Sequence, residues 1–401
     1  MRHITCIEDL RTLARQRVPK MFFDYVDSGS WTESSYRANT SDFADLLLRQ
    51  RVGIETSSRT TVARVLGAEV RMPVALAPAG LTGLQHADGE ILAARAAERF
   101  GVPFVLSTMS ICSLEDVAAG TSSPFWFQLY LMRDRGFVLS LMERARAAAC
   151  PVLILTLDLP VMGQRHRDVR NGLSARLRPN LKTVLAFGSR PRWCMGMLRT
   201  RRRGFGNIAG HAGAPDDVQA LAEWTASQFD PSVSWKDVAW VRRHWPGKLI
   251  VKGVMDPDDA RYALDAGVDG LIVSNHGGRQ LDGTSSSIRA LPAIAEAVGD
   301  RLEVHFDGGI RCGQDVLRAL ALGAKSVYIG RPYLYGLGAL GEQGVTRCLD
   351  IIHKELDHTM AFCGLTDLAQ ATPEILLGTK RKVREDGWAR PGIAGLWRAH
   401  D

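Results

Sequence analysis

Residues 302–332 read LEVHFDGGIRCGQDVLRALALGAKSVYIGRP. Two short apolar runs, Leu302–Gly308 and Ser326–Pro332, flank the segment Gly313–Leu322, which is rich in alanine and leucine and is followed by a glycine. Continuous apolar runs are typical of parallel strands that are buried on both faces. A glycine directly after an alanine- and leucine-rich segment is typical of a helix end. The stretch therefore predicts a strand, a helix and a second strand parallel to the first.

The same unit recurs along the chain. Eight strand–helix units in sequence favour a closed (β/α)8 TIM barrel over an open sheet. A GxGxxG motif does not follow the first strand, which argues against a nicotinamide cofactor. The predicted strands are Pro73–Gly80, Pro103–Thr108, Phe125–Tyr130, Val152–Asp158, Leu249–Val254, Gly270–Asn275, Leu302–Gly308 and Ser326–Pro332. The clearest predicted helices are Asp88–Phe100, Asp134–Ala149, Asp256–Ala266, Ile288–Val298 and Gly313–Leu322.

Two segments do not fit this alternation. The residues before the first strand predict an N-terminal helical cap, with helices near Ile7–Arg17 and Pro19–Ser28. About ninety residues separate the fourth and fifth strands, far more than a normal βα loop contains. We therefore predict an insertion at 171–230, rich in Arg, Gly, Pro and Trp, followed by the expected helix at Ser234–Trp245.

The bulk composition agrees with a folded protein, since 46% of the 401 residues are hydrophobic and 23% are charged. A TIM barrel takes about 250 residues and grows to over 400 with insertions, so we assign 1–377 to one domain and 378–401 to a C-terminal tail. No run approaches the roughly 18 apolar residues of a membrane span, and the N-terminus lacks a signal-peptide pattern. We expect a cytoplasmic protein. The seven scattered cysteines predict neither disulfides nor a zinc site.

The positive charge is concentrated in one segment. Between Arg165 and Arg203 there are twelve Arg or Lys residues and one acid, although the whole chain carries only +7. Leu, Val, Phe187, Trp193 and two methionines are interleaved with these cations. Such a pattern suits an anionic membrane surface, where each cation contributes about 1 kcal/mol. We expect peripheral membrane contact through 171–205; the alternative is a solvated lid over the active site. No motif accompanies the charge to indicate nucleic-acid binding.

Polar groups follow nearly every predicted strand, where the active site of such a barrel lies. After the last two strands, Gly308, Gly309 and Gly330 would let backbone N–H groups approach an anion, and Arg311 and Arg331 would supply charge. These two loops therefore predict a phosphate site.

Three further residues predict a proton-transfer site for a carboxylic acid. A carboxylate such as Asp158 orients an imidazole and stabilises its protonated form, which suits His276 as a general base. The planar guanidinium of Arg279 matches a substrate carboxylate.

Four motifs now carry a family resemblance. The stretch SNHGGRQLD at Ser274–Asp282, with FQLY at 127–130, VKG at 251–253 and DGGIR at 307–311, resembles the FMN-dependent L-2-hydroxy acid dehydrogenase and oxidase family. The resemblance runs from about Ile4 to Leu377. It implies that the protein binds FMN and oxidises an L-2-hydroxy acid to the 2-oxo acid.

Two features favour the bacterial quinone-linked L-lactate dehydrogenase branch. These are LSTMSICSLE at Leu106–Glu115 and the long insertion with its exit near Gln228–Asp237. Plant-type glycolate oxidases have a Trp in place of Met109. This branch implies oxidation of L-lactate to pyruvate, a membrane quinone as acceptor, a homotetramer and a location at the cytoplasmic face of the inner membrane. A mandelate-type dehydrogenase or an O2-using oxidase is the alternative.

The resemblance also implies residue roles. His276 with Asp158 would remove either the Cα proton or the hydroxyl proton of the substrate, and Lys252 would stabilise the reduced flavin. The substrate would contact Tyr25, Met109, Tyr130, Arg165 and Arg279. The cofactor would contact Ala79, Gly80, Ser107, Gln128, Thr156, Lys252, Ser274, Asp307, Gly308, Gly309, Arg311, Gly330 and Arg331.

Overall fold

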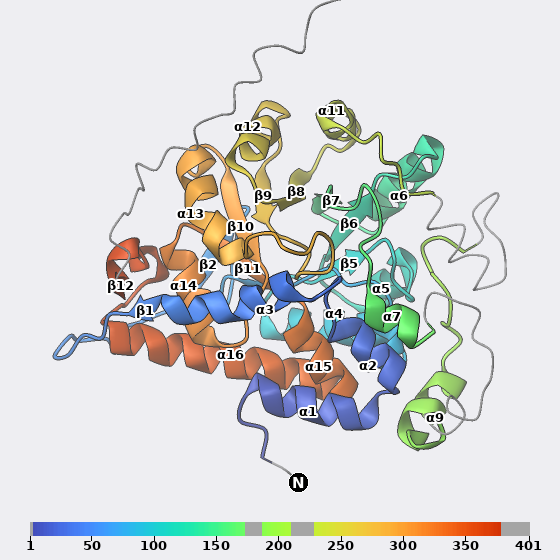
Figure 1. Ribbon diagram of the computed structural model, residues 1–401, viewed down its shortest axis with the longest axis horizontal. Coiled ribbons are helices and arrows are strands. Elements are labelled where there is room, and N and C mark those ends of the chain that lie inside the picture. The colour runs from blue at the N-terminus through green and yellow to red at the C-terminus, as the bar shows by residue number, and fades with distance from the viewer. Residues whose placement is uncertain (1–2, 173–186, 210–227, 378–401) are drawn as a thin grey trace, which may run out of the picture.

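The computed structural model describes residues 3–172, 187–209 and 228–377. Eight parallel strands lie side by side in the order β4-β11-β10-β9-β8-β7-β6-β5. The two ends of this sheet meet where Leu76 pairs with Phe104, so the sheet closes into the predicted TIM barrel (Figure 1). Each of the eight predicted runs matches one strand, although β8 begins one residue before its predicted run. The strands are β4 (Val74–Leu76), β5 (Val105–Ser107), β6 (Trp126–Tyr130), β7 (Val152–Thr156), β8 (Lys248–Val254), β9 (Gly270–Val273), β10 (Glu303–Asp307) and β11 (Ser326–Ile329).

Helices surround the strands and cover their outer faces (Figure 1). Several begin at a capping side chain: Ser113 accepts from the N–H of Asp116, and Asp134 accepts from the N–H of Phe137. The helices are α4 (Gly89–Phe100), α5 (Leu114–Gly120), α6 (Arg135–Ala147), α11 (Trp235–His244), α12 (Pro257–Asp265), α13 (Ser287–Val298), α14 (Gly313–Ala321), α15 (Arg331–Leu340) and α16 (Glu342–Cys363). All predicted helices are present, with ends shifted by a few residues.

A short hairpin closes the barrel at the amino ends of the strands. It consists of β2 (Ala63–Val65) and β3 (Ala68–Val70), and its valines pack against interior residues such as Ile154 and Ile250. The sequence interpretation missed this hairpin, because strands of three residues show no clear period. The turn did carry one signal in Gly67, since residues of such a turn adopt positive φ, here 51° at Leu66 and 84° at Gly67.

The N-terminal cap lies against the barrel through α1 (Ile7–Arg17), α2 (Lys20–Val26) and α3 (Ser34–Ser41). Helix α1 packs on α15, and the pair β1 (Leu47–Leu48) and β12 (Leu376–Leu377) joins the cap to the end of the described chain. Above the barrel mouth, the backbone of the cap lies very close to the loop that follows β10. A Cβ atom on Gly309 would lie 1.8 Å from the backbone oxygen of Asn39.

The insertion after the fourth strand is described in part. Its described part contains α9 (Pro191–Arg199), and α7 (His166–Arg170) lies just before the insertion. Its exit is tied to the barrel, because Arg135 pairs with Asp230 at 3.0 Å and with Asp237 at 2.8 Å. The rest of the insertion and the predicted tail at 378–401 lie outside the described residues. The assignment of 1–377 to one domain stays a prediction.

We expect Gly309→Ala to weaken the docking of the cap. The matched control is Gly267→Ala, because Gly267 also has a positive φ but no atom lies within 4 Å of its Cβ position. Overpacking costs about 1–3 kcal/mol, so the midpoint of thermal unfolding should fall further for Gly309→Ala than for the control. Equal midpoints for the two variants would contradict the close approach of cap and barrel.

Candidate active site

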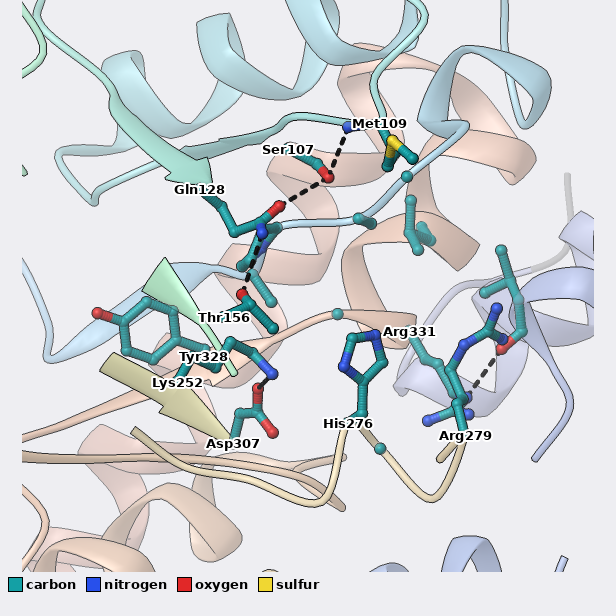
Figure 2. Close-up of a pocket in the computed structure, with 18 of the residues that line it drawn as sticks. Ser107, Met109, Gln128, Thr156, Lys252, His276, Arg279, Asp307, Tyr328 and Arg331 are labelled. Atoms are coloured by element: carbon teal, nitrogen blue, oxygen red, sulfur yellow. Dashed lines mark hydrogen bonds and ion pairs between the residues drawn. The ribbon is translucent and has the colours of Figure 1, made fainter. Parts of the chain in front are cut away.

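One cavity lies at the carboxyl ends of the strands, under the cap (Figure 2). It brings together nearly all of the residues that the sequence singled out. Asp158 and Ser274 are the exceptions, since they lie directly behind its wall. The predicted residues that line it are Tyr25, Ala79, Gly80, Ser107, Met109, Gln128, Tyr130, Thr156, Arg165, Lys252, His276, Arg279, Asp307, Gly308, Gly309, Arg311, Gly330 and Arg331.

Three neighbouring strands contribute a line of polar side chains. The hydroxyl of Ser107 donates to the amide oxygen of Gln128 at 3.0 Å, and the amide nitrogen of Gln128 donates to the hydroxyl of Thr156 at 3.0 Å (Figure 2). Because β5, β6 and β7 are adjacent and parallel, their carboxyl ends present these groups side by side. These two hydrogen bonds fix the orientation of the Gln128 amide. The three side chains together present a row of polar groups that suits a planar heterocyclic ligand.

A buried cation lies beside this line. The ammonium group of Lys252 donates to the hydroxyl of Ser274 at 2.7 Å and pairs with Asp307 at 3.0 Å. Burial lowers the pKa of Lys252, but Asp307 and Asp158 overcome this effect and hold the pKa above its usual value, so the side chain stays charged. Oδ1 of Asp307 is buried and has no hydrogen-bond partner among the described residues. That free oxygen can accept a hydroxyl from a ligand.

The imidazole of His276 is held by a carboxylate. Its Nδ1 lies 2.8 Å from Oδ1 of Asp158, which is possible because Gly253 has no side chain: a Cβ there would lie 2.6 Å from the Cβ of Asp158. Burial lowers the pKa of His276, and Asp158 only partly opposes this, so the ring is neutral near pH 7. Burial raises the pKa of Asp158, but His276 and Lys252 lower it by more. The net pKa lies below its usual value, so the carboxylate stays ionised. The pair is therefore poised to accept a proton.

The backbone at His276 is unusual. Its φ is +57°, a left-handed conformation that a non-glycine residue rarely adopts. The hydroxyl of Ser274 accepts from the N–H of His276 at 3.0 Å and so supports this conformation. Ser274 was predicted to contact the cofactor. In the structure its hydroxyl links Lys252 to the backbone of the histidine, and the cofactor contact stays a prediction.

Two arginines lie on the other side of the cavity. The guanidinium of Arg279 stacks on the ring of Tyr25, 4.6 Å from its centroid, and donates to the carbonyl of Tyr25. Burial lowers the pKa of Arg279 to about 10, and the charge of Arg165 lowers it too, so the guanidinium of Arg279 remains a cation at neutral pH. Burial raises the pKa of Tyr130, which keeps its phenol protonated and able to donate a hydrogen bond. These groups together suit a carboxylate with a neighbouring oxygen.

The predicted phosphate site lies at the start of α15, with Gly330 at its N-cap position. The guanidinium of Arg331 donates to the carbonyl oxygens of Val26 and Ser28, each at 2.8 Å, so part of its role is to hold the cap. The glycines at 308 and 309 also serve packing, because Cβ atoms there would overlap Ser287 and Asn39. These constraints add to the predicted role of the two loops in binding an anion.

Several residues of the site escaped the sequence interpretation. Phe205 and Phe229 line the cavity from the two described sides of the insertion, and Phe229 packs edge-on against Tyr130 at 5.5 Å. Asp168 and Tyr328 line it as well. Only Asp168 had a visible signal, as the one acid in a strongly basic segment.

A buried carboxyl clamps the first two βα loops together. Oε1 of Glu90 accepts from the N–H groups of Gly83 at 3.0 Å and Ile111 at 2.9 Å. Asn207 supports the second loop from the insertion, since its side chain bonds to Ser110 and Leu114. The loops carry Gly80 and Met109, which line the cavity. Glu90 and Asn207 therefore fix one wall of the site from behind.

Glu90→Leu should destabilise the protein, because it leaves two buried N–H groups without an acceptor at a cost of about 1–3 kcal/mol each. Glu90→Gln keeps an acceptor oxygen and should retain most of the stability. Burial already raises the pKa of Glu90 toward the neutral form, so loss of its charge costs little. Equilibrium unfolding in urea would measure the free energy of unfolding of each variant. A loss in the Gln variant as large as in the Leu variant would show that no such clamp exists.

Comparisons with known proteins agree with this geometry. The family model described as FMN-dependent dehydrogenase matches residues 14–377. The chain is 48% identical over 377 residues to L-lactate dehydrogenase from Caulobacter vibrioides, which covers 93% of this chain and 97% of that protein. It is 46% identical over 379 residues to L-lactate dehydrogenase from Azorhizobium caulinodans, with 94% and 100% covered.

Solved structures are also similar. The crystal structure of (S)-mandelate dehydrogenase, described as a monotopic membrane protein, superposes with a TM-score of 0.90 at 35% identity, covering 94% of this chain and 99% of that one. A mandelate oxidase variant with (S)-mandelic acid gives a TM-score of 0.78 at 35% identity, with 92% and 97% covered. The match of the family model to most of the barrel, together with these relatives, shows that the chain belongs to the FMN-dependent dehydrogenase family.

Proposed function

We propose that this protein is an FMN-dependent dehydrogenase that oxidises L-lactate to pyruvate. The observation that carries the proposal is that His276, held by Asp158, shares one cavity with the guanidinium groups of Arg165 and Arg279. A base and a carboxylate-binding pair in one cavity suit the oxidation of a 2-hydroxy acid. The relatives named L-lactate dehydrogenase, at 48% and 46% identity, favour lactate as the substrate.

The residues present fit FMN. The unpartnered Oδ1 of Asp307 would accept a ribityl hydroxyl, and the charged Lys252 would stabilise negative charge on the reduced ring. The backbone of Ala79 and Gly80 and the polar line from Ser107 to Thr156 would contact the ring. The phosphate would be held by the N–H groups at Gly308, Gly309 and Gly330 with Arg311 and Arg331. FMN, when bound, supplies the acceptor for the two electrons that leave the substrate.

The chain's own residues then orient the substrate and move its proton. Arg279 and Arg165 would bind the carboxylate, with Tyr25 beside it, and the phenol of Tyr130 would donate to the substrate oxygen. Met109 and Phe229 would border the rest of the molecule. Nε2 of His276 would accept the proton, from either Cα or the hydroxyl, and Asp158 would stabilise the imidazolium that forms.

An aromatic substrate of the mandelate type is the second candidate. The observation that favours it is the similarity to (S)-mandelate dehydrogenase, at a TM-score of 0.90. Both candidate functions would use the same base and the same arginines. The two substrates differ in the side group that Met109 would border, a methyl group in lactate and a phenyl ring in mandelate. Rates with L-lactate and with (S)-mandelate would separate them, and formation of H2O2 would indicate an oxidase.

Asp158→Asn should lower kcat/KM for L-lactate by roughly 10²–10⁴-fold, because the base loses its partner. It should also shift the acid limb of the pH profile. In the native protein this limb should lie below pH 6.5, the ordinary pKa of histidine, because burial lowers the pKa of His276. Asp158 opposes this effect, so its loss should move the limb to still lower pH. The exposed Asp258→Asn is the control, and an acid limb that stays in place in Asp158→Asn would contradict the pairing.

We further propose that the protein contacts a membrane through 171–205 and passes electrons to a quinone there. None of the described helices is long and apolar enough to cross a bilayer. Helix α9 instead lies at the periphery of the molecule (Figure 1), and its Met195 and Leu198 are 51% and 75% exposed. A basic side chain, Arg203, donates to the carbonyl of Leu198. Residues 173–186 of the proposed contact lie outside the described part of the chain. The cytoplasmic face as its location and the homotetramer stay predictions.

Two aromatic residues predicted for this contact also pack against the protein itself. Trp193 stacks on Phe22 of α2 at 5.3 Å and donates to the carbonyl of Leu84 at 2.9 Å. Phe187 packs against the same ring at 6.0 Å. Both therefore attach α9 to the cap, which leaves the exposed Met195 and Leu198 to meet the lipid.

The double substitution Met195→Ser, Leu198→Ser should weaken binding to vesicles that contain anionic lipid, because it removes the exposed apolar side chains of α9. Sedimentation with vesicles would measure the bound fraction. The control is Val52→Ser, since Val52 is 81% exposed but lies on the cap segment that follows β1. Equal binding by all three proteins would show that α9 does not contact the membrane.

A further inference from the structure

Asp168 is a buried carboxyl for which the proposed chemistry has no use. It lies on α7, in the turn that follows Arg165, and only 6% of its surface is exposed. It lines the same cavity as Arg165 and Arg279. Its Oδ1 has no hydrogen-bond partner among the described residues. A buried, unpartnered carboxyl is costly, so its charge must be balanced by nearby groups.

The two arginines supply part of that balance, although burial outweighs them and the pKa of Asp168 stays above its usual value. Arg165 also has a buried atom, Nε, without a partner in the described part of the chain. Burial raises the pKa of Asp168, while the charges of Arg279 and Arg165 oppose the rise. In turn, Asp168 opposes the lowering of the pKa of Arg279. The three groups therefore form one electrostatic cluster within the cavity.

Asp24 is the other carboxylate close enough to influence Asp168. It lies on α2, where Lys20 pairs with it and the side-chain amide of Asn171 donates to it at 2.8 Å. Asp24 does not line the cavity. Its charge is thus balanced separately, which leaves Asp168 as the acid that acts on the two arginines.

The charge balance decides which anion fits. Two guanidinium groups and one substrate carboxylate would leave one excess positive charge, which would attract a second carboxylate on the substrate. An ionised Asp168 removes that excess. We propose that Asp168 is a specificity-determining residue, which offsets one arginine charge so that the site accepts 2-hydroxy acids with one carboxylate and disfavours those with two. This inference rests on the proposed function.

The test compares the holoenzyme with Asp168→Asn, which keeps the shape of the side chain and removes its charge. We would measure kcat/KM for L-lactate and for L-malate, a dicarboxylic L-2-hydroxy acid. We would also titrate propionate and malonate, which cannot be oxidised in this way, and follow the flavin absorbance. Charges within one pocket are close enough to interact strongly. Loss of the Asp168 charge should therefore raise the malate-to-lactate ratio of kcat/KM and the malonate-to-propionate ratio of affinities by about tenfold. Asp24→Asn is the matched control and should change either ratio less than about twofold.

Each outcome has a distinct meaning. If the native enzyme oxidises L-lactate but both ratios are unchanged in Asp168→Asn, the inference is wrong and the proposed function stands. If neither hydroxy acid reduces the flavin of the native enzyme, the proposed function itself is wrong. Should Asp168→Asn fail to fold, Asp168→Ser provides a second neutral variant. The native enzyme also tests the inference alone, since a preference for malate over lactate would overturn it.

Discussion

The ammonium group of Lys252 is buried at the mouth of the barrel, 3.0 Å from Asp307 and 4.0 Å from Asp158. A lone charge in this position would be strongly disfavoured, so the cation and the two carboxylates depend on one another. Asp158 in turn orients His276, and Asp307 keeps one oxygen free for a ligand. The barrel makes this possible because adjacent parallel strands present their last side chains at one edge. A neutral imidazole, a buried cation and a carboxylate with one oxygen unpartnered among the described residues follow from this one arrangement.

Elements outside the barrel complete the site. The cap supplies Tyr25 and the carbonyl that holds Arg279, while α7 supplies Arg165 and Asp168. The insertion contributes Phe205 and Phe229 to the cavity and supports the Met109 loop through Asn207. In the proposed roles, the groups that would recognise the carboxylate thus come mainly from loops and cap, whereas those that would contact the flavin ring come largely from strand ends. Substrate preference can therefore change without changing the barrel.

Much of this was predictable from the sequence, because buried parallel strands have a clear signature and polar residues at their ends are conspicuous. All eight strands and the pairing of His276 with Asp158 were predicted. The hairpin at 63–70 was missed, since its strands are too short for any period to show. Glu90 was missed because it appears in sequence as an ordinary polar residue near a helix start. The packing of Phe187 and Trp193 on Phe22 was not foreseen, because composition does not show which aromatic residues pack against the protein itself.

The central claim is that a stereospecific base and a carboxylate clamp lie together at a flavin site. The most direct test is to record the visible spectrum of the purified holoenzyme without oxygen, before and after addition of L-lactate or D-lactate. We expect the flavin absorbance to bleach with L-lactate and to persist with D-lactate, because Arg279 and Arg165 would fix the orientation of the substrate relative to His276. Equal bleaching by both enantiomers, or bleaching by neither while FMN is bound, would contradict it.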